Sequence, residues 1–357
     1  MIISNIFGSL PDGQPVHQYS LTNGRGAQVD ILTLGGIIRR WLVPGNTTVA
    51  TDNADDIVLG FDTVEAYLED QAYVGAVVGR YANRIAKGKF TLQGTPYQVD
   101  INQGGNCLHG GQNGFNRRLW QATILAQGDE PQLALSLVSP DGDQGFPGEL
   151  TVKVIYTLSA QNGLNIEYFA KSTKATLFNP TQHSYFNLAG HQSGPVTQHQ
   201  VQIFASRFTP TDDNAIPTGE LASVTNTPLD LRELVTLATP LAATHPQLTI
   251  GNGFDHNWCV DAYQPDMPQP ALVAKVVEPQ SGRTLSVYST MAGIQLYIAN
   301  YLSAQPLGKE QTAYGANHAL CLETQCYPDA PNQGHFPSAE LKAGEAYYSV
   351  TEYRVTG

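Results

Sequence analysis

Hydrophobic residues alternate with polar residues along much of the chain, and this period of two predicts strands. The alternation is clear at residues 151–158 and returns at residues 293–299 and 347–355. Successive side chains of a strand point to opposite faces, so the pattern lets a sheet bury one face and expose the other. We therefore predict a fold built largely from antiparallel strands.

Three turn dipeptides predict hairpins between neighbouring strands. Glycine permits the positive φ that tight hairpin turns need, and each dipeptide contains one. Each separates two strand-like runs: Asn23-Gly24 lies between 16–22 and 27–34, Asn162-Gly163 between 151–159 and 164–170, and Ser281-Gly282 between 271–277 and 284–288.

Helical patterns are few and short. Residues 62–65 read as a capping box that starts a helix at Asp62 and carries it to about Leu68. A second short helix is predicted at residues 230–235.

Composition and length favour one large all-β domain. The chain has 357 residues, of which 14% are charged, and its 34 glycines and 22 prolines suit many short strands joined by turns. No internal repeat or break in composition marks a domain boundary. We therefore predict a single domain spanning residues 1–357, folded as a large antiparallel β-sandwich with a few short helices.

Net charge and cysteine usage limit which binding partners and which cellular compartment are expected. The net charge is −12 and no basic cluster is found, which argues against nucleic acid and anionic membrane surfaces as partners. No stretch approaches 18 apolar residues, and the first residues do not have the pattern of a signal peptide. The four cysteines form no C-x-x-C pair and are predicted to be reduced and mostly buried. We expect a soluble, cytoplasmic protein.

Three segments combine an ionisable side chain with strand-forming or glycine-rich neighbours. His183 lies among aromatic and polar residues at 179–188, Glu323 lies in the largely apolar run 319–325, and His109 precedes two glycines. Such a set suggests an acid/base site assembled on a sheet, in which desolvation raises the pKa of Glu323. Each residue also has a structural interpretation. Glu323 could be a solvent-facing glutamate, His183 a histidine of the core, and His109 a turn residue.

Polar residues in two further segments suit sugar hydroxyls. Asn83 and Arg84 lie in a glycine-bounded turn with Arg80, and an arginine fork suits hydroxyl or carboxylate groups. Asp255 is an acceptor for vicinal hydroxyls. The alternative interpretations are a surface or ion-pair role for the arginines and an Asx turn for Asp255.

Motifs for metals and nucleotide cofactors are missing from the sequence. None of the nine histidines belongs to an H-E-x-x-H or zinc-finger pattern, and no glycine-rich nucleotide loop is found. His191 and His199 lie in a Gly-, Ser- and Gln-rich stretch and are predicted to be solvated. We expect no bound metal and no cofactor.

Taken together, the motifs resemble those of the aldose 1-epimerases, also called galactose mutarotases. The resemblance extends over nearly the whole chain and runs in order through residues 79–86, 108–111, 141–149, 179–188, 216–220, 254–256, 293–297 and 322–332. It implies a large β-sandwich of the galactose mutarotase type. It also implies cofactor-free interconversion of the α and β anomers of aldohexoses such as galactose and glucose.

The resemblance assigns expected roles to seven residues. Glu323 matches the family's general base and His183 its general acid, which would call for an ionised glutamate and a protonated histidine. The matching sugar-binding positions are Asn83, Arg84, His109, Asp255 and Gln295. The expected partner is a monosaccharide substrate, and the protein is expected to be a monomer or a homodimer.

Two other functions remain open on the same kind of fold. A hexose-phosphate epimerase needs additional cations for the phosphate, and no basic cluster beyond Arg80 and Arg84 is found. A non-catalytic sugar-binding protein would keep the binding residues but could lose the acid or the base. A glycoside hydrolase is less favoured, because hydrolases usually need two carboxylates.

Overall fold

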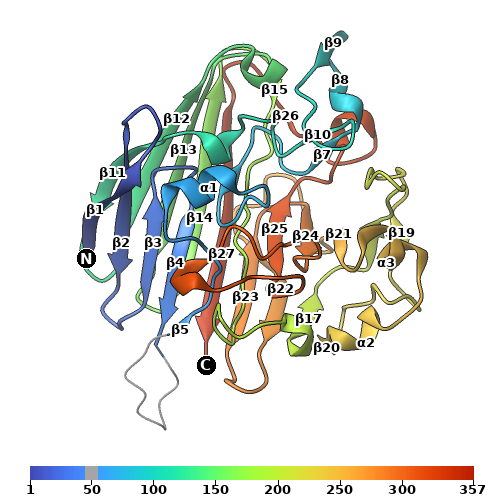
Figure 1. Cartoon of the computed structure of the whole chain (residues 1–357). Helices are drawn as coiled ribbons and strands as arrows, with labels where there is room; N and C mark the ends of the chain where they lie inside the picture. Colours follow the sequence, from blue (N-terminus) through green and yellow to red (C-terminus); the bar gives the residue numbers. More distant parts are fainter. Residues whose placement is uncertain (45–54) are drawn as a thin grey trace.

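The largest element of the fold is a nine-stranded antiparallel sheet. The computed structural model describes residues 1–44 and 55–357. Within these residues the strand order of the sheet is β11-β12-β13-β14-β27-β23-β22-β17-β20 (Figure 1). The bounds are β11 Gln121–Ala126, β12 Gln132–Ser139, β13 Leu150–Leu158, β14 Gly163–Ser172, β17 Gln200–Ile203, β20 Val235–Thr236, β22 Ala271–Val277, β23 Thr284–Ser289 and β27 Ala346–Thr356.

Two five-stranded sheets complete the main architecture. The first has the order β1-β2-β3-β4-β5 and the second β19-β18-β21-β24-β25. Phe186 forms bridges to both Val58, just after β5, and Leu320, just before β25, so it links the two sheets. The bounds are β1 Ile2–Ser9, β2 Pro15–Thr22, β3 Gln28–Leu32, β4 Ile38–Val43, β5 Asp55–Asp56, β18 Arg207–Thr209, β19 Ala222–Ser223, β21 Asp255–Cys259, β24 Gly293–Tyr297 and β25 Cys321–Gln325.

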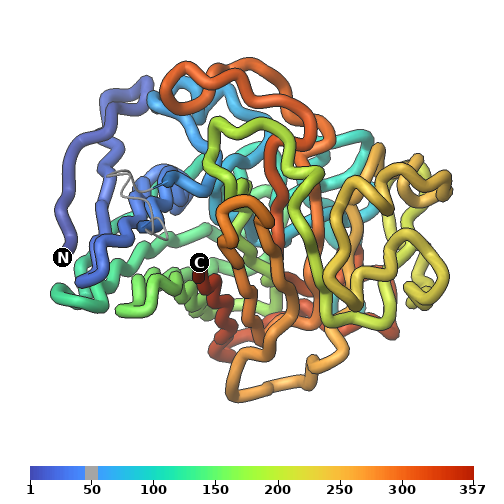
Figure 2. Tube along the Cα trace, turned by 90° about the horizontal axis from the view of Figure 1, so that it is seen from below, coloured from blue at the N-terminus to red at the C-terminus, as the bar shows by residue number. Residues whose placement is uncertain are grey.

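Four two-stranded ladders accompany the three large sheets. The view from below shows where the N-terminal strands lie relative to a later segment of the chain. The blue N-terminal strands and the yellow segment around residues 200–260 lie at opposite ends of the molecule (Figure 2). The ladders pair β6 Val77–Val78 with β16 Thr181–Gln182, β7 Arg84–Ile85 with β10 Cys107–Leu108, β8 Lys89–Leu92 with β9 Thr95–Gln98, and β15 Thr176–Leu177 with β26 Glu340–Leu341.

A shared hydrophobic core joins the three large sheets. Leu135 and Val154 of the nine-stranded sheet belong to the same buried cluster as Trp41 of the first five-stranded sheet and Trp258 and Leu322 of the second. Burying the apolar faces of stacked sheets is the main stabilising term of such an architecture. The predicted antiparallel β-sandwich is confirmed, whereas its organisation as one domain stays a prediction.

The three predicted hairpins are all formed. β2 pairs with β3, β13 with β14 and β22 with β23, in each case antiparallel. In β13 the burial alternates strictly between buried and more exposed residues, as the sequence pattern predicts.

The helix predictions were partly wrong. Helix α1 runs over Val64–Glu69 and is capped by Thr63, whose hydroxyl accepts a hydrogen bond from the Ala66 N–H, rather than by Asp62. Asp62 instead accepts a hydrogen bond from Arg39. Residues 230–235 form no helix, because Asp230 bonds to Arg232 in a local turn that competes with helical bonding.

Two short helices were not predicted from the sequence. They are α2, Ala238–Leu241, and α3, Pro246–Gly251. No helix of the described residues is long and apolar enough to cross a membrane. All four cysteines are buried and unpaired.

Candidate active site

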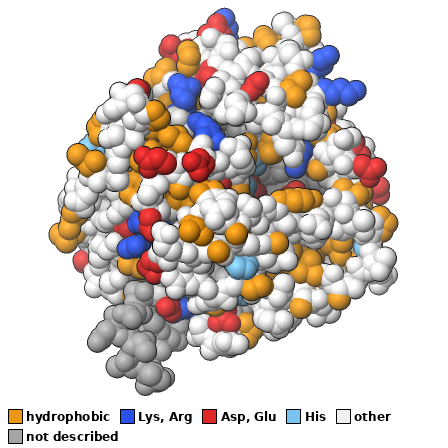
Figure 3. All heavy atoms as spheres, in the orientation of Figure 1, with side chains coloured by type: hydrophobic (Ala, Val, Ile, Leu, Met, Phe, Trp, Pro, Cys, Tyr) orange, Lys and Arg blue, Asp and Glu red, His pale blue; other side chains and the backbone are white. Residues whose placement is uncertain are grey.

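A cavity of about 380 Å³ lies among the loops and strand ends around β7, β10 and β25. The face seen in Figure 3 is hollowed, with acidic, basic and hydrophobic side chains around the hollow. Ionisable and aromatic side chains dominate the inner part of the cavity: Tyr73, Arg84, His109, His183, Tyr185, Asp255, Tyr297 and Glu323. A concave site with a few convergent polar groups is the usual form of a small-molecule site.

Strand register places Glu323 in this cavity. In β24 and β25, Glu323 lies opposite Gln295, and Leu322 lies opposite Leu296. Because alternate side chains point to opposite faces, the two leucines enter the hydrophobic core while Glu323 points the other way. The side chain is 2% exposed, and no described group hydrogen-bonds its Oε2 atom.

The environment of Glu323 favours its protonated form. Burial raises its pKa well above the ordinary value, and the negative charge of Asp255 adds to this effect. The positive charge of Arg84 opposes it to a smaller extent. Because Glu323 is buried, the alternative of a solvent-facing glutamate is excluded.

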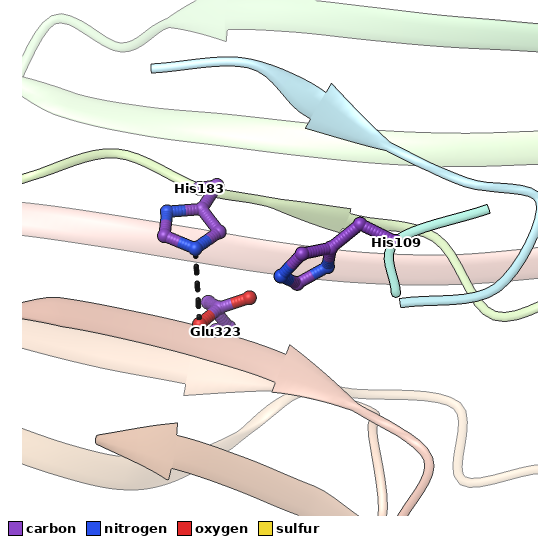
Figure 4. Close-up of side chains that lie close together, drawn as sticks. All are labelled: His109, His183 and Glu323. Atoms are coloured by element: carbon purple, nitrogen blue, oxygen red, sulfur yellow. Dashed lines mark ion pairs between the residues drawn. The ribbon is translucent and has the colours of Figure 1, made fainter. Parts of the chain in front are cut away.

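His183 follows β16 and faces Glu323. Its N–H donates to the carbonyl of Ala76 and its own carbonyl accepts from Gly75, which fixes the backbone beside β6. The Nε2 atom lies 3.6 Å from Oε1 of Glu323 (Figure 4). The imidazole stacks on Tyr185 with ring centroids 5.1 Å apart. Burial lowers the pKa of His183 to about 4.

His109 is the third member of the cluster, and its hydrogen-bonding role is fixed by the backbone. Its Nδ1 atom accepts a hydrogen bond of 3.1 Å from the Asn83 N–H. In the neutral ring the proton then resides on Nε2, so that nitrogen is a donor. Burial lowers the pKa of His109 well below its ordinary value, and the nearby His183 and Arg84 add to this. Its ring stands edge-on to that of His183, with centroids 5.2 Å apart.

The glycine after His109 is required by the close packing of two turns. Gly110 has a φ of +90°, and a Cβ atom there would lie 1.9 Å from the carbonyl oxygen of Gly79. The missing side chain therefore lets the turn of His109 pack directly against the turn that carries Asn83 and Arg84.

The same three side chains form the one group of potential metal ligands found among the described residues. One ligand atom from each of His109, His183 and Glu323 lies within 4.8 Å of the others. However, a histidine that binds metal through Nε2 normally donates from Nδ1, whereas Nδ1 of His109 is an acceptor. The donor set therefore fits a hydrogen-bonding site better than a metal centre.

A polar chain extends from Glu323 along the cavity wall. Gln295 donates a hydrogen bond of 2.7 Å to Oδ1 of Asp255, and Oδ2 of Asp255 lies 3.8 Å from the Arg84 guanidinium. Arg84 Nε also donates to Gln103. Both charged side chains are thus oriented before any ligand binds.

The structure brings the seven predicted residues together, but not all of them line the cavity. Six of them line the cavity: Asn83, Arg84, His109, His183, Asp255 and Glu323. Gln295 lies behind Asp255 and reaches it by the hydrogen bond described above. The Asn83 side chain accepts from the Arg84 N–H, so this residue contacts two neighbours through its own backbone and amide.

Most of the cavity residues were not predicted from the sequence, among them Tyr73, Gln103, Tyr185 and Tyr297. A signal was present for two of them. Tyr185 and Tyr297 are each two residues beyond a predicted site residue, His183 and Gln295, and so share its face of an extended chain. Tyr73 and Gln103 come from loops, where no periodic pattern predicts the direction in which a side chain points.

Other sequence-based interpretations need correction. His191 and His199 are buried, not solvated: His191 pairs with the Tyr314 hydroxyl, and His199 accepts from the Leu188 N–H. The Gly-rich stretch that carries them is packed against the sandwich. Arg80 is buried too and donates to Ser139 and to carbonyls of nearby loops, so it plays a structural role.

Comparison with known proteins identifies the family. A sequence model of the aldose 1-epimerase family matches residues 17–354. The chain belongs to the aldose 1-epimerase family. It is 44% identical to galactose mutarotase from Bos taurus over 98% of this chain and 97% of that one. It is 36% identical to aldose 1-epimerase from Escherichia coli, over 96% of each chain.

Solved structures agree with this assignment. An aldose epimerase homologue from C. elegans superposes with a TM-score of 0.83 and 30% identity, covering 94% of this chain and 98% of that one. Galactose 1-epimerase from Lactobacillus acidophilus superposes with a TM-score of 0.86 at 23% identity, covering 100% and 98%, and so supports the fold. The prediction of an aldose 1-epimerase, an isomerase with a galactose mutarotase-like fold, is confirmed.

Proposed function

We propose that this aldose 1-epimerase interconverts the anomers of galactose and glucose by acid/base catalysis at His183 and Glu323. The observation that carries the proposal is the pairing of these two buried groups, 3.6 Å apart, in a cavity lined by hydrogen-bonding side chains. A hemiacetal has two oxygens that must exchange protons with the protein, and two adjacent acid/base groups match that need.

Ring opening moves two protons. Glu323 accepts the proton of the C1 hydroxyl while His183 donates a proton to the ring oxygen. The bond between C1 and the ring oxygen then breaks, and C1 becomes an aldehyde carbon. After rotation about the C1–C2 bond, the C5 hydroxyl attacks the other face of the aldehyde. His183 recovers its proton from that hydroxyl, and Glu323 returns its proton to the carbonyl oxygen.

The pair carries one proton throughout this cycle. Ring opening begins from an ionised Glu323 and a protonated His183, whereas burial favours the neutral form of each group in the free protein. The two states differ only by transfer of that proton between the partners. The Oε2 atom of Glu323 has no partner among the described residues, and a hydrogen bond donated to it by a sugar hydroxyl would favour the ionised carboxylate.

The remaining polar groups suit the other hydroxyls of a hexose. His109 offers an N–H donor, Arg84 a fixed fork of donors and Asp255 an acceptor. The tyrosine rings of the wall exclude water around the reacting atoms, which strengthens electrostatic interactions inside the cavity.

The alternative functions have less support. A phosphate would need several cations, and Arg84 is the only lysine or arginine among the described residues that line the cavity. A non-catalytic sugar-binding protein would not need the buried His183–Glu323 pair. The cytoplasmic location and the monomeric or homodimeric state stay predictions.

Polarimetry of freshly dissolved α-D-galactose and α-D-glucose tests the proposed function. The protein is expected to accelerate the approach to anomeric equilibrium without any added cofactor, and the ratio of the two rates ranks the sugars. If neither rotation curve is accelerated, the proposed function is wrong.

A further inference from the structure

The imidazole of His183 is oriented by ring packing rather than by hydrogen bonds. Its Nδ1 atom is buried and has no partner among the described residues, and its Nε2 atom lies 3.6 Å from Glu323, which is beyond hydrogen-bonding distance. The χ2 angle of a histidine has broad intrinsic minima, so the side chain alone does not fix the plane of the ring. Because the acid must present Nε2 to the ring oxygen of the sugar, its neighbours have to fix that plane.

Two tyrosine rings lie nearly parallel to the ring of His183. The centroid of Tyr185 lies 5.1 Å from that of His183, with 26° between the two planes. The corresponding values for Tyr73 are 6.1 Å and 27°. The Tyr73 centroid also lies 4.7 Å from that of His109. These are the separations of interacting aromatic rings, so Tyr73 packs beside both histidines.

The backbone of Tyr73 has an uncommon conformation that a buried carboxylate stabilises. Its φ is +57°, in the left-handed region. The Asp70 carboxylate accepts a hydrogen bond of 2.8 Å from the Ala72 N–H and another of 2.8 Å from the Val74 N–H, on the two sides of Tyr73. Asp70 is 8% exposed, and its carbonyl accepts from Arg117. Asp70 therefore determines where the turn places the tyrosine.

Further hydrogen bonds connect this turn to the segments of both histidines. The Gly75 N–H donates to the carbonyl of His183. The Tyr73 hydroxyl accepts from Asn102, whose amide group also bonds to the N–H and the carbonyl of Leu108, the residue before the other histidine. Tyr73 is thus fixed at its backbone and at its hydroxyl, and it forms a rigid wall for a ring without hydrogen bonds of its own.

We propose that Tyr73 is a positioning residue that holds the imidazoles of His183 and His109 in the orientation required for anomer exchange, and that Asp70 holds Tyr73 in place. Burial raises the pKa of Tyr73 to about 12, so its hydroxyl stays neutral at neutral pH and takes no part in the proton transfers. The proposal rests on the proposed function, because the orientation of His183 affects the rate only if this histidine is the acid.

The experiment measures kcat and KM for galactose mutarotation in wild type and four variants. Tyr73→Ala removes the ring, whereas Tyr73→Phe keeps the ring and loses only the hydroxyl. Asp70→Asn keeps every aromatic ring but has one side-chain oxygen instead of two, so one hydrogen bond of the turn is lost. Tyr97→Ala removes another half-buried tyrosine, which stacks on Phe90 outside the cavity lining, and is the matched control.

Tyr73→Ala is expected to lower kcat by about 10- to 100-fold, because misplacing a reacting group by about 1 Å can cost about 10²-fold. Asp70→Asn is expected to lower kcat by a smaller factor. KM should rise by less than kcat falls, since Arg84 and Asp255 keep the hydrogen bonds that orient them. Tyr73→Phe and Tyr97→Ala are expected to match wild type.

The positioning role is wrong if Tyr73→Ala keeps the kcat of wild type or changes only KM. It is also wrong if Tyr73→Phe loses as much as Tyr73→Ala, because the hydroxyl would then act on the sugar, or if Tyr97→Ala loses as much. If circular dichroism shows that Tyr73→Ala does not fold, Asp70→Asn decides: a lowered kcat supports the role and an unchanged kcat contradicts it. If wild type does not accelerate galactose mutarotation, the proposed function itself fails.

Discussion

The Nε2 atom of His183 lies 3.6 Å from the Oε1 atom of Glu323, and both side chains are almost completely buried. The two residues are 140 positions apart in the chain, and two separate features of the fold bring them together. The chain around Phe186 bridges to the residue before β25, while the register of β24 and β25 turns Glu323 away from the core. At this separation the two groups form no direct hydrogen bond but interact electrostatically, so the charge of one influences the protonation of the other.

Replacing His183 by asparagine tests the acid. His183→Asn is expected to lower kcat by about 10²–10⁴-fold, because a positioned acid or base contributes that much to a proton transfer. KM should change far less, since asparagine keeps hydrogen-bonding capacity. Steady-state kinetics on galactose measures both constants. His17→Asn, which changes a half-buried histidine outside the cavity lining, is the control. A change in KM alone would assign His183 to binding.

Arg84 is expected to act in sugar binding. Arg84→Ala removes a fork of donors that Gln103 and Asp255 hold in place, so KM for galactose should rise while the protein stays folded. Arg84→Lys keeps the charge but loses the planar fork, so its KM should lie between those of wild type and Arg84→Ala. Kinetics with all three proteins gives the order. Unchanged kcat and KM in Arg84→Ala would make this arginine structural.

Arg80, four residues earlier, is expected to affect stability. Arg80→Met removes the side-chain donor to the carbonyls of Ser139 and Pro147, while the Pro140 carbonyl keeps the Asp143 N–H. Because an unsatisfied buried polar group costs about 1–3 kcal/mol, the free energy of unfolding should fall by at least about 2 kcal/mol. Urea unfolding measures it. Arg232→Met, which breaks exposed interactions with Asp230 and Thr225, should cost less than about 1 kcal/mol. Equal losses in the two variants would contradict the structural role of Arg80.

The pH dependence of kcat/KM should be bell-shaped with a broad plateau. Activity needs one proton on the His183–Glu323 pair, so it falls when the pair gains a second proton or loses its last one. Burial lowers the pKa of His183 to about 4 and raises that of Glu323 above its ordinary value. The acid limb is therefore expected near pH 4, and neutral pH should lie on the plateau. An acid limb at the ordinary histidine value near 6.5 would contradict the desolvation of His183.

Much of the fold could be predicted from local pattern. Alternation in β13 and the glycine turns of three hairpins follow directly from strand geometry and backbone conformation. The helix predicted at residues 230–235 failed because the Asp230 side chain bonds to its own neighbour, a competition that hydrophobic spacing does not report.

The sequence could nominate residues for the candidate site but could not give their geometry. The resemblance of motifs led to His183 and Glu323, yet no sequence pattern gives their separation or the backbone N–H that makes His109 a donor. His191 and His199 were misjudged, since a Gly- and Gln-rich composition says nothing about what packs over a loop. Tertiary contacts decide these features.

Glu323 is proposed to act as the base of an anomer-exchanging enzyme. The most direct measurement is polarimetry of α-D-galactose with wild type, Glu323→Gln and, as a matched control, Glu233→Gln, an exposed glutamate, at equal concentrations. Glutamine preserves the shape and removes the ionisable group. Wild type and Glu233→Gln are expected to accelerate mutarotation equally, and Glu323→Gln to lose about 10²–10⁴-fold in kcat while keeping its Tm. Near wild-type turnover by a folded Glu323→Gln would contradict the account.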